Sequence, residues 1–214
     1  MMNDVNLLVC SDLHGSNKAK ELIGNALEDD PFDAVIICGD FTTDGTTKYV
    51  REVLETVSLP LLAVPGNCDS EAVVWLLEEH DRSVHSKRVE LKGVRFYGFG
   101  GAPPSPYRMP FEVDEKMIAD KLRASAVRGG VMVTHTPAYG FNDMSSSGHH
   151  MGSSAILEVV QEFRPRVALS GHIHESRGSE VSKGTMFVNP GPAKEGYYAK
   201  VRVGKTVRAV LCSI

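Results

Sequence analysis

The sequence predicts an α/β protein built from two β-sheets that both carry helices. Short apolar runs alternate with amphipathic stretches along most of the chain, which is typical of β-α-β units with largely parallel strands. The middle and the tail instead contain pairs of segments with the pattern of antiparallel strands. One sheet holding all of these strands would be very wide, so two sheets fit the pattern better.

The first half of the chain is predicted as three strand–helix units. The strands are expected at residues 5–10, 33–38 and 59–64, and the helices at residues 17–30, 46–57 and 70–80. A hairpin is predicted next, at residues 86–101, with its turn near Lys92-Gly93.

The alternation resumes after a proline-rich loop at residues 102–110. Helices are expected at residues 112–127 and 153–163, and strands at residues 130–135 and 166–172. The tail, residues 184–192 and 197–214, is predicted as antiparallel strands with a Gly-Lys turn. No internal repeat or linker is visible, so residues 1–214 are predicted to form one domain.

Composition and charge narrow the class of protein. The 214 residues carry 23 basic and 27 acidic side chains, a net charge of −4, and no Lys/Arg block, which argues against stable nucleic-acid binding. The start of the chain does not resemble a signal peptide and no apolar run is long enough to cross a bilayer, so we expect a cytoplasmic protein without membrane contact. The four cysteines are isolated, as is typical of small core residues in a reducing compartment. Homo-oligomer formation is left open.

Asp, Asn or His follows five of the apolar runs directly, usually beside glycine. These residues are Asp12, His14, Asp40, Asn67, His135, His172 and His174. The carboxyl ends of strands are where open α/β sheets bind ligands, and glycine lets the backbone approach a ligand closely. A single Asp or His at such a place is more often a turn residue, but five coordinated strand ends favour a site.

The spacing of these residues points to metal binding. Asp12 and His14, like His172 and His174, are two residues apart, so in extended backbone both members of a pair point to the same side. The set mixes oxygen and nitrogen donors and lacks thiolates, which does not indicate a closed structural zinc site. Seven such donors suit two divalent ions that share a carboxylate, an arrangement used for in-line attack at phosphorus.

The ordered series "DLH", "GD", "GN-x-D", a lone His and "GHIH" resembles the calcineurin-like metallophosphoesterase superfamily. The resemblance implies a four-layer α-β-β-α sandwich of two mixed sheets. It also implies that one ion takes Asp12, His14 and His174, that the other takes Asn67, His135 and His172, and that Asp40 bridges both. The loops at residues 98–112 and 148–156 look most like those of small prokaryotic phosphoesterases.

Such a pair of ions implies a mechanism without a protein nucleophile. Two cations lower the pKa of a bridging water, and the resulting hydroxide, on ions linked by Asp40, attacks phosphorus. Asn67 and Asp69 are the further residues expected to assist catalysis. Mn²⁺ is the expected metal, with Fe²⁺, Zn²⁺ or Ni²⁺ as alternatives.

Cys68 stands where most of the superfamily has a histidine that contacts the phosphate and is proposed to protonate the leaving oxygen. A neutral thiol is a poor replacement, and loss of a general acid costs ~10²–10⁴-fold, mainly for poor leaving groups. Cys68, Arg108 (beside Tyr107) and His150 are the expected substrate contacts, with His149 as an alternative to His150. The segment around them, with Ser153 and Ser154 placed to cap a helix facing an anion, also fits a flexible Gly/Ser loop.

The leading functional hypothesis is a phosphoesterase that hydrolyses small phosphodiesters or nucleotide-like substrates. A diester carries less charge than a monoester and often has a competent leaving group, which suits a site without a general acid. The alternatives are a phosphomonoesterase, including a protein phosphatase, and a non-catalytic interaction scaffold of the same fold. All seven positions that match the superfamily hold residues able to ligate a metal, which favours catalysis over the scaffold.

Overall fold

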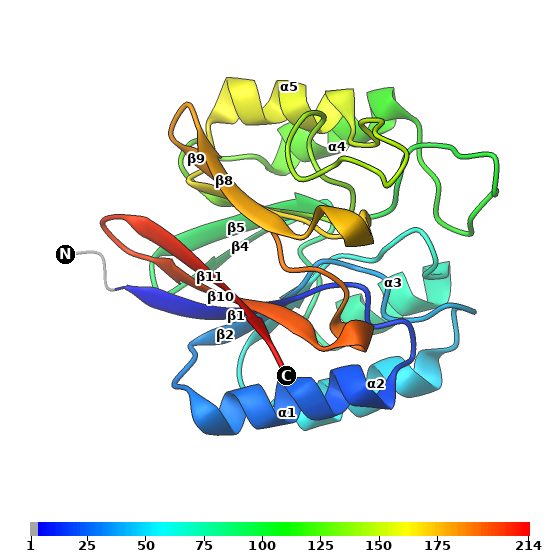
Figure 1. The fold of residues 1–214 in the computed structure, drawn as a ribbon, viewed down its shortest axis with the longest axis vertical. Helices are drawn as coiled ribbons and strands as arrows, with labels where there is room; N and C mark the ends of the chain where they lie inside the picture. The colour runs from blue at the N-terminus through cyan, green and yellow to red at the C-terminus, as the bar shows by residue number, and fades with distance from the viewer. Residues whose placement is uncertain (1–3) are drawn as a thin grey trace.

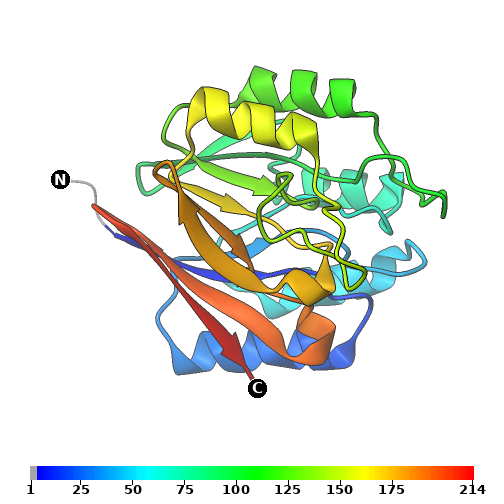
Figure 2. The same cartoon turned by 45° about the horizontal axis from the view of Figure 1, so that its top comes forward.

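The computed structural model describes residues 4–214 and has four layers (Figure 1). Helices α1 to α3 cover the outer face of one sheet, a second sheet packs against its inner face, and α4 and α5 cover the second sheet. Figure 2 shows the same order of layers after a turn of 45°. The predicted α/β class with two mixed sheets and outer helices is confirmed.

The first sheet has five strands in the order β11-β10-β1-β2-β3. Their bounds are β1 Val5–Cys10, β2 Ala34–Ile37, β3 Leu61–Ala63, β10 Tyr197–Val203 and β11 Val207–Ser213. The strands β1, β2 and β3 pair in parallel, with Leu7 opposite Ala34, whereas β10 is antiparallel to both β1 and β11. The parallel half therefore directs the carboxyl ends of three strands to one edge.

The second sheet has six strands in the order β4-β5-β6-β7-β9-β8. Their bounds are β4 Arg88–Leu91, β5 Val94–Phe99, β6 Val131–Thr134, β7 Val167–Leu169, β8 Gly178–Ser182 and β9 Thr185–Asn189. Strands β5, β6, β7 and β9 are parallel, and the two edge strands are antiparallel to their neighbours.

The helices lie close to where the amphipathic stretches predict them. Their bounds are α1 Asn17–Asp29, α2 Thr47–Thr56, α3 Glu71–Glu79, α4 Glu115–Ser125 and α5 Ser154–Phe163, with short 3₁₀ helices η1 His174–Ser176 and η2 Ala193–Glu195. Helix α1 begins after Ser16, whose hydroxyl accepts a hydrogen bond from the Ala19 N–H. Its buried residues, such as Leu22 and Ile23, recur at helical spacing and pack on the first sheet.

The alternation of side chains along β1 explains why the two sheets stack. Leu8 and Cys10 point to the helices, while Val5, Leu7 and Val9 point to the second sheet and join its Val94, Phe96 and Val131 in one apolar layer. All of these side chains are buried, so the layer excludes water and fixes the two strand-end edges beside each other.

Local backbone chemistry accounts for the turns. The β4–β5 hairpin turns at Lys92-Gly93 as predicted, and both residues have positive φ (50° and 80°), as a type I′ turn requires. The sequence pattern did not predict β8, which pairs with β9 through a second turn of this kind at Lys183-Gly184. Strand β8 is largely exposed, so it lacks the apolar run on which strand prediction depends.

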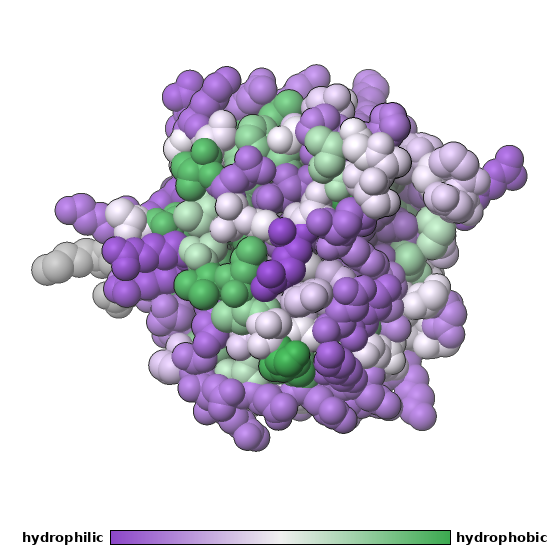
Figure 3. Space-filling model, viewed as in Figure 1, coloured by the Kyte–Doolittle hydropathy of each residue, from purple (hydrophilic) through white to green (hydrophobic). Residues whose placement is uncertain are grey.

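The surface is mostly polar, and on the face seen in Figure 3 the apolar areas are small and separated. Within residues 4–214, no helix is both long enough and apolar enough to span a bilayer.

Candidate metal centre

The predicted donors lie where the carboxyl ends of β1, β2, β3, β6 and β7 converge between the two sheets. Backbone hydrogen bonds tie these ends together. The Asp12 N–H donates to the Gly39 carbonyl at 3.0 Å, the His14 N–H to the Asp40 carbonyl at 2.9 Å, and the Gly171 N–H to the His135 carbonyl at 2.9 Å. The last bond joins two strand ends of the second sheet, and the first two join β1 to β2.

The donors do not sit on extended backbone, so the spacing rule used for the two pairs does not apply. Asp12, His14, Asp40 and His172 all have positive φ, between 49° and 68°. This left-handed conformation is unfavourable for residues other than glycine, and residues that adopt it are frequent at functional sites. His172 and His174 do not point to the same place, contrary to what their spacing predicts. The ring of His172 lies near His135, and that of His174 lies near His14.

Glycines beside the donors are required by close packing. A Cβ at Gly66 would overlap the Asp40 carboxylate, and one at Gly171 would overlap Ser11 and crowd the Asp12 carboxylate. Glycine was predicted to let the backbone approach a ligand. At Gly66 and Gly171 it lets the backbone approach a neighbouring strand end.

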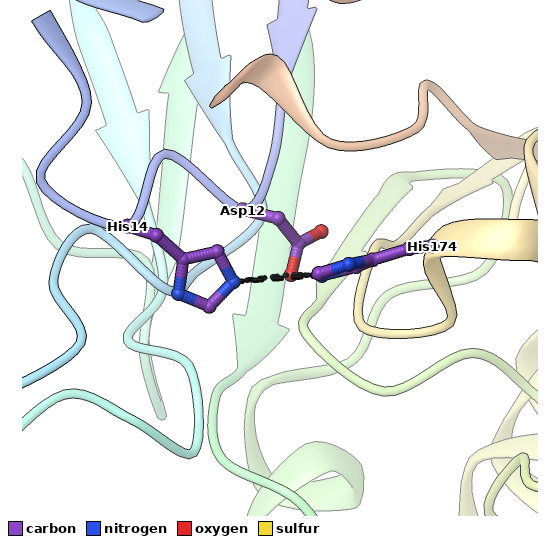
Figure 4. A group of neighbouring side chains, drawn as sticks. All are labelled: Asp12, His14 and His174. Atoms are coloured by element: carbon purple, nitrogen blue, oxygen red, sulfur yellow. Dashed lines mark hydrogen bonds and ion pairs between the residues drawn. The ribbon is translucent and has the colours of Figure 1, made fainter. Parts of the chain in front are cut away.

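Asp12, His14 and His174 form the first group of donors (Figure 4). The imidazoles of the two histidines approach the Asp12 carboxylate from two sides. Nε2 of His174 is 3.2 Å, and Nε2 of His14 is 3.8 Å, from Oδ1 of Asp12, and the two Nε2 atoms are 3.5 Å apart. Three possible ligand atoms from two distant parts of the chain thus face one point.

The Asp12 carboxylate lacks part of its expected hydrogen bonding. Its side chain is buried, and Oδ2 accepts a hydrogen bond from the His172 N–H at 3.1 Å. Oδ1 accepts no hydrogen bond from residues 4–214, and the side-chain atom of the donor set that approaches it most closely is Nε2 of His174, at 3.2 Å. Burial acts to raise the Asp12 pKa, but the imidazoles of His174 and His135 outweigh it and hold the pKa well below its usual range. A buried, ionised oxygen without a donor is what a cation site would leave behind when metal-free.

Asp40 lies between this group and a second one. Its Oδ2 is 3.6 Å from Nε2 of His14 and also 3.6 Å from Nε2 of His135. Its Oδ1 accepts the Cys68 N–H at 2.8 Å, which holds the carboxylate in place. Asp12, Asp40 and His135 form a further group whose ligand atoms lie within 4.8 Å of one another.

The second group contains His135, Asn67 and His172. Nδ1 of His135 donates to the Cys38 carbonyl at 2.7 Å, and Nε2 lies 2.8 Å from Oδ1 of Asn67. Burial acts to lower the His135 pKa, but the carboxylates of Asp40 and Asp12 raise it above its usual value. Burial and the neighbouring His135 lower the pKa of His172 to about 4.

The seven predicted donors are therefore all brought to one place, and the donor chemistry fits divalent cations. Carboxylate oxygens, an amide oxygen and imidazole nitrogens suit Mn²⁺, Fe²⁺, Zn²⁺ or Ni²⁺, and the shared Asp40 oxygen lies between the two groups.

The sequence profile of the calcineurin-like phosphoesterase superfamily domain matches residues 5–207. The chain belongs to the calcineurin-like phosphoesterase superfamily. Members of this superfamily are metal-dependent phosphoester hydrolases. The predicted resemblance is thereby confirmed over nearly the whole chain.

The chain is also similar to individual proteins. A Methanocaldococcus jannaschii protein of uncharacterised function is 32% identical over 171 residues, covering 75% of this chain and 78% of that protein. A Thermus thermophilus structure has a TM-score of 0.73 at 19% identity, covering 97% of this chain and 99% of the other. An archaeal phosphodiesterase has a TM-score of 0.55 at 17% identity, covering 97% and 100%. At these identities the two solved structures establish the fold alone.

Cys68 of this calcineurin-like phosphoesterase is buried and faces the donors. Its thiol lies with His14 and Asp40 in a group whose possible ligand atoms are within 4.8 Å of one another. Burial and the adjacent Asp40 carboxylate raise the pKa of the thiol well above its usual value. The side chain is thus a neutral thiol at the edge of the metal centre, which makes it a poor nucleophile.

Asp69, which was expected to assist catalysis, holds the loops around the site together. Its carboxylate is fully buried and accepts hydrogen bonds from the N–H groups of Phe41, Thr42 and Gly66 and from the Thr42 hydroxyl. Burial and the nearby Asp40 carboxylate raise its pKa to about 6. With both oxygens engaged by the protein, Asp69 positions the two loops that carry Asp40 and Asn67.

Arg108 and Tyr107 lie on the projecting loop at residues 102–112 and are exposed, Tyr107 by 85%. Within residues 4–214, no hydrogen bond or ion pair joins the Arg108 side chain to the donors. The base of the loop does reach the site, because the Phe111 N–H donates to the Asn67 carbonyl at 3.0 Å.

One further expectation is corrected by the structure. Ser153 does cap α5, but the anion at that helix end is the protein's own Glu115, whose carboxylate accepts from the Ser153 hydroxyl and the N–H groups of Ser154 and Ala155.

His85 is half-buried. The centre of its ring is 4.5 Å from that of Phe99 and 5.5 Å from that of Phe111.

Sequence reasoning missed Asp143, which is buried and pairs with His150. The signal available was its place in the same Gly/Ser-rich segment, seven residues before the histidine, but only the folded loop brings the two together.

Proposed function

We propose that this protein is a two-metal hydrolase of small phosphodiesters, including nucleotide-like ones. The observation that carries the proposal is the Asp12 carboxylate, buried and ionised, with Oδ1 free of hydrogen bonds within residues 4–214 and faced by two imidazoles. Leaving such an oxygen unpaired in the interior is costly, so the arrangement is best explained by a cation that completes it.

Seven side chains would hold the metals. Asp12, His14 and His174 would bind one ion, Asn67, His135 and His172 the other, and Asp40 would bridge both. The equal distances from Asp40 Oδ2 to Nε2 of His14 and of His135, 3.6 Å each, support the bridging role. When bound, two such ions supply a nucleophilic water at neutral pH and positive charge for the phosphoryl oxygens.

The surrounding residues restrict the reaction. The fixed backbone of the strand ends holds the donors without reorganisation, which favours charge stabilisation in the transition state. The neutral Cys68 places no cation beside the phosphoryl group at its position. A diester carries one negative charge fewer than a fully ionised monoester, so it depends less on such a cation.

Mn²⁺ is the proposed metal, because three of the seven donors, Asp12, Asp40 and Asn67, offer carboxylate or amide oxygens. Fe²⁺, Zn²⁺ and Ni²⁺ remain compatible with the imidazoles.

The test is hydrolysis by the purified full chain, stripped of metal and reloaded with Mn²⁺, Fe²⁺, Zn²⁺ or Ni²⁺ in turn. Bis(p-nitrophenyl) phosphate and p-nitrophenyl phosphate are the paired substrates. We expect metal-dependent turnover with a higher kcat/KM for the diester. Preference for the monoester would favour a phosphomonoesterase, and metal binding without turnover of either ester would favour a scaffold of the same fold.

A further inference from the structure

The segment between β6 and α5 is an ordered small hairpin. Met144 and His150 pair across it as an antiparallel bridge, and the Met151 N–H donates to the Asp143 carbonyl at 2.9 Å. The Ser145 N–H also donates to the His149 carbonyl at 2.9 Å. These bonds give the Gly/Ser-rich sequence a defined shape and fix the position of His150.

Asp143 is the buried centre of this hairpin. Its side chain is almost fully buried, and Oδ2 accepts the N–H groups of Gly140 at 2.9 Å and Gly152 at 3.0 Å. The remaining oxygen, Oδ1, lies 2.6 Å from Nδ1 of His150. Both oxygens of the Asp143 carboxylate therefore have hydrogen-bond partners within the hairpin segment, and the imidazole of His150 is one of these partners.

The hydrogen bond to Asp143 determines which ring nitrogen of His150 remains available to a substrate. An ionised carboxylate only accepts hydrogen bonds, so Nδ1 carries the hydrogen and donates to Asp143. Nε2, on the far side of the ring, points away from Asp143, and the side chain is 38% exposed. The ring of Tyr139, 5.2 Å away, contacts the imidazole and limits its movement. A carboxylate behind one ring nitrogen holds the imidazole in one tautomer and orientation, as in hydrolase triads.

The hairpin is attached beside the metal centre. The Ser176 hydroxyl donates to the Met144 carbonyl at 2.6 Å, and the Ser146 N–H donates to Oε1 of Glu175 at 2.8 Å. Glu175 directly follows the donor His174, so both bonds join the hairpin to η1. Figures 1 and 2 both show the loop next to η1, at the edge where strand ends of the two sheets meet.

We propose that His150 donates the proton to the leaving oxygen, with Asp143 as its positioning residue. The inference rests on the proposed phosphodiesterase function. It supplies an imidazole that position 68 lacks, because that position holds Cys68. It also revises the expectation that this chain has no general acid.

The step balances without any further reactant. A water oxygen, which releases one proton to solvent, forms a bond to phosphorus, and the bond from phosphorus to the leaving oxygen breaks. The electron pair of the broken bond stays on the leaving oxygen, which takes the proton from Nε2 of His150. The products are a phosphomonoester and an alcohol. The neutral imidazole, still held by Asp143, regains a proton from solvent.

His149 provides a matched control within the same hairpin. It is adjacent to His150 and exposed, but its Nδ1 lies 3.1 Å from the Ser147 hydroxyl, away from Asp143. If the histidines of this loop acted only through the positive charge they can carry, replacing either one would lower the hydrolysis rate by a similar factor.

The kinetic test compares wild type with His150→Asn, His149→Asn and Asp143→Asn, on a series of diesters graded by leaving-group pKa. We expect His150→Asn to lose ~10²-fold or more with alkyl leaving groups and little with p-nitrophenolate, which needs no proton. His149→Asn should match wild type. Asp143→Asn, like His150→Asn, should make the rate fall more steeply as the pKa of the leaving group rises. A uniform loss across the series, or equal effects of the two histidine variants, would overturn the proposal.

A second readout does not need turnover. Nitrogen-15 NMR of the wild-type imidazoles should show neutral His150 as the Nδ1–H form, and Asp143→Asn should convert it to the Nε2–H form. The same tautomer in both proteins would refute the positioning role. Absence of hydrolysis for every ester and metal would instead count against the proposed function, so the two failures are distinguishable.

Discussion

Asp69 binds the loop that begins at Asp40 through hydrogen bonds to its backbone. Oδ1 of Asp69 accepts the Thr42 N–H at 3.0 Å, and Oδ2 accepts the N–H groups of Phe41 at 3.2 Å and of Gly66 at 2.8 Å. The Cys68 N–H in turn donates to Oδ1 of Asp40. The two strand ends that carry Asp40 and Asn67 are therefore linked in both directions, and their donors hold one relative position.

Asp69→Ala should destabilise the protein. The change leaves several buried N–H groups without acceptors, each of which costs about 1–3 kcal/mol, so we expect a loss of about 3 kcal/mol in the free energy of unfolding. Urea unfolding measures it. Asp44→Ala is the control, because Asp44 lies on the same loop but is exposed and accepts the local Thr46 N–H. Equal effects of the two substitutions would mean that Asp69 does not link the loops.

Asp40→Asn should weaken binding of both ions and abolish turnover. The amide keeps the size of the side chain but removes the negative charge shared by His14 and His135. Metal content after dialysis against Mn²⁺ and calorimetric titration are the measurements. Retention of two ions with near wild-type hydrolysis would remove Asp40 from the proposed centre.

Cys68→Ser should leave metal content intact and change hydrolysis little. Seven oxygen and nitrogen donors already serve the proposed ions, and a metal-activated water needs no protein nucleophile, so the thiol has neither role. Mass spectrometry of the enzyme during turnover should detect no phosphorylated cysteine. A trapped phosphocysteine, or complete loss of activity in the serine variant, would contradict this.

His85 should make stability depend on pH. Nδ1 of His85 accepts the Gly100 N–H at 3.0 Å, which requires the neutral ring, and burial lowers its pKa to about 4. Glu78 acts to raise this pKa, whereas Lys121 and Lys87 act to lower it. Between pH 6.5 and about 4 the unfolded chain binds a proton that the folded protein does not, so stability is full above pH 6.5 and falls as the pH drops.

The matched variant is His85→Gln, which keeps a hydrogen-bond acceptor and cannot titrate. We expect wild type to lose up to about 3 kcal/mol more than the variant between pH 7.5 and pH 4. Urea unfolding at several pH values gives the difference. Parallel curves for the two proteins would show that His85 titrates alike in the folded and unfolded states.

The sequence by itself determined the fold class, most elements and the strand ends at which the donors lie. Continuous apolar runs such as residues 5–10 can be strands covered on both faces, and the polar residues that end them must gather where parallel strands end. The order of the motifs then led to the superfamily. The exposed strand β8 was missed because it carries no apolar run.

Only the tertiary structure decided the roles of individual polar residues. Asp69 and Asp143 are both acidic residues in glycine-containing loops, yet one binds backbone N–H groups and the other also binds an imidazole. The left-handed backbone of Asp12 and His172 likewise follows from contacts between distant strand ends. Local sequence does not encode which hydrogen-bond partner a buried side chain meets, because that partner comes from another part of the chain and is set by packing.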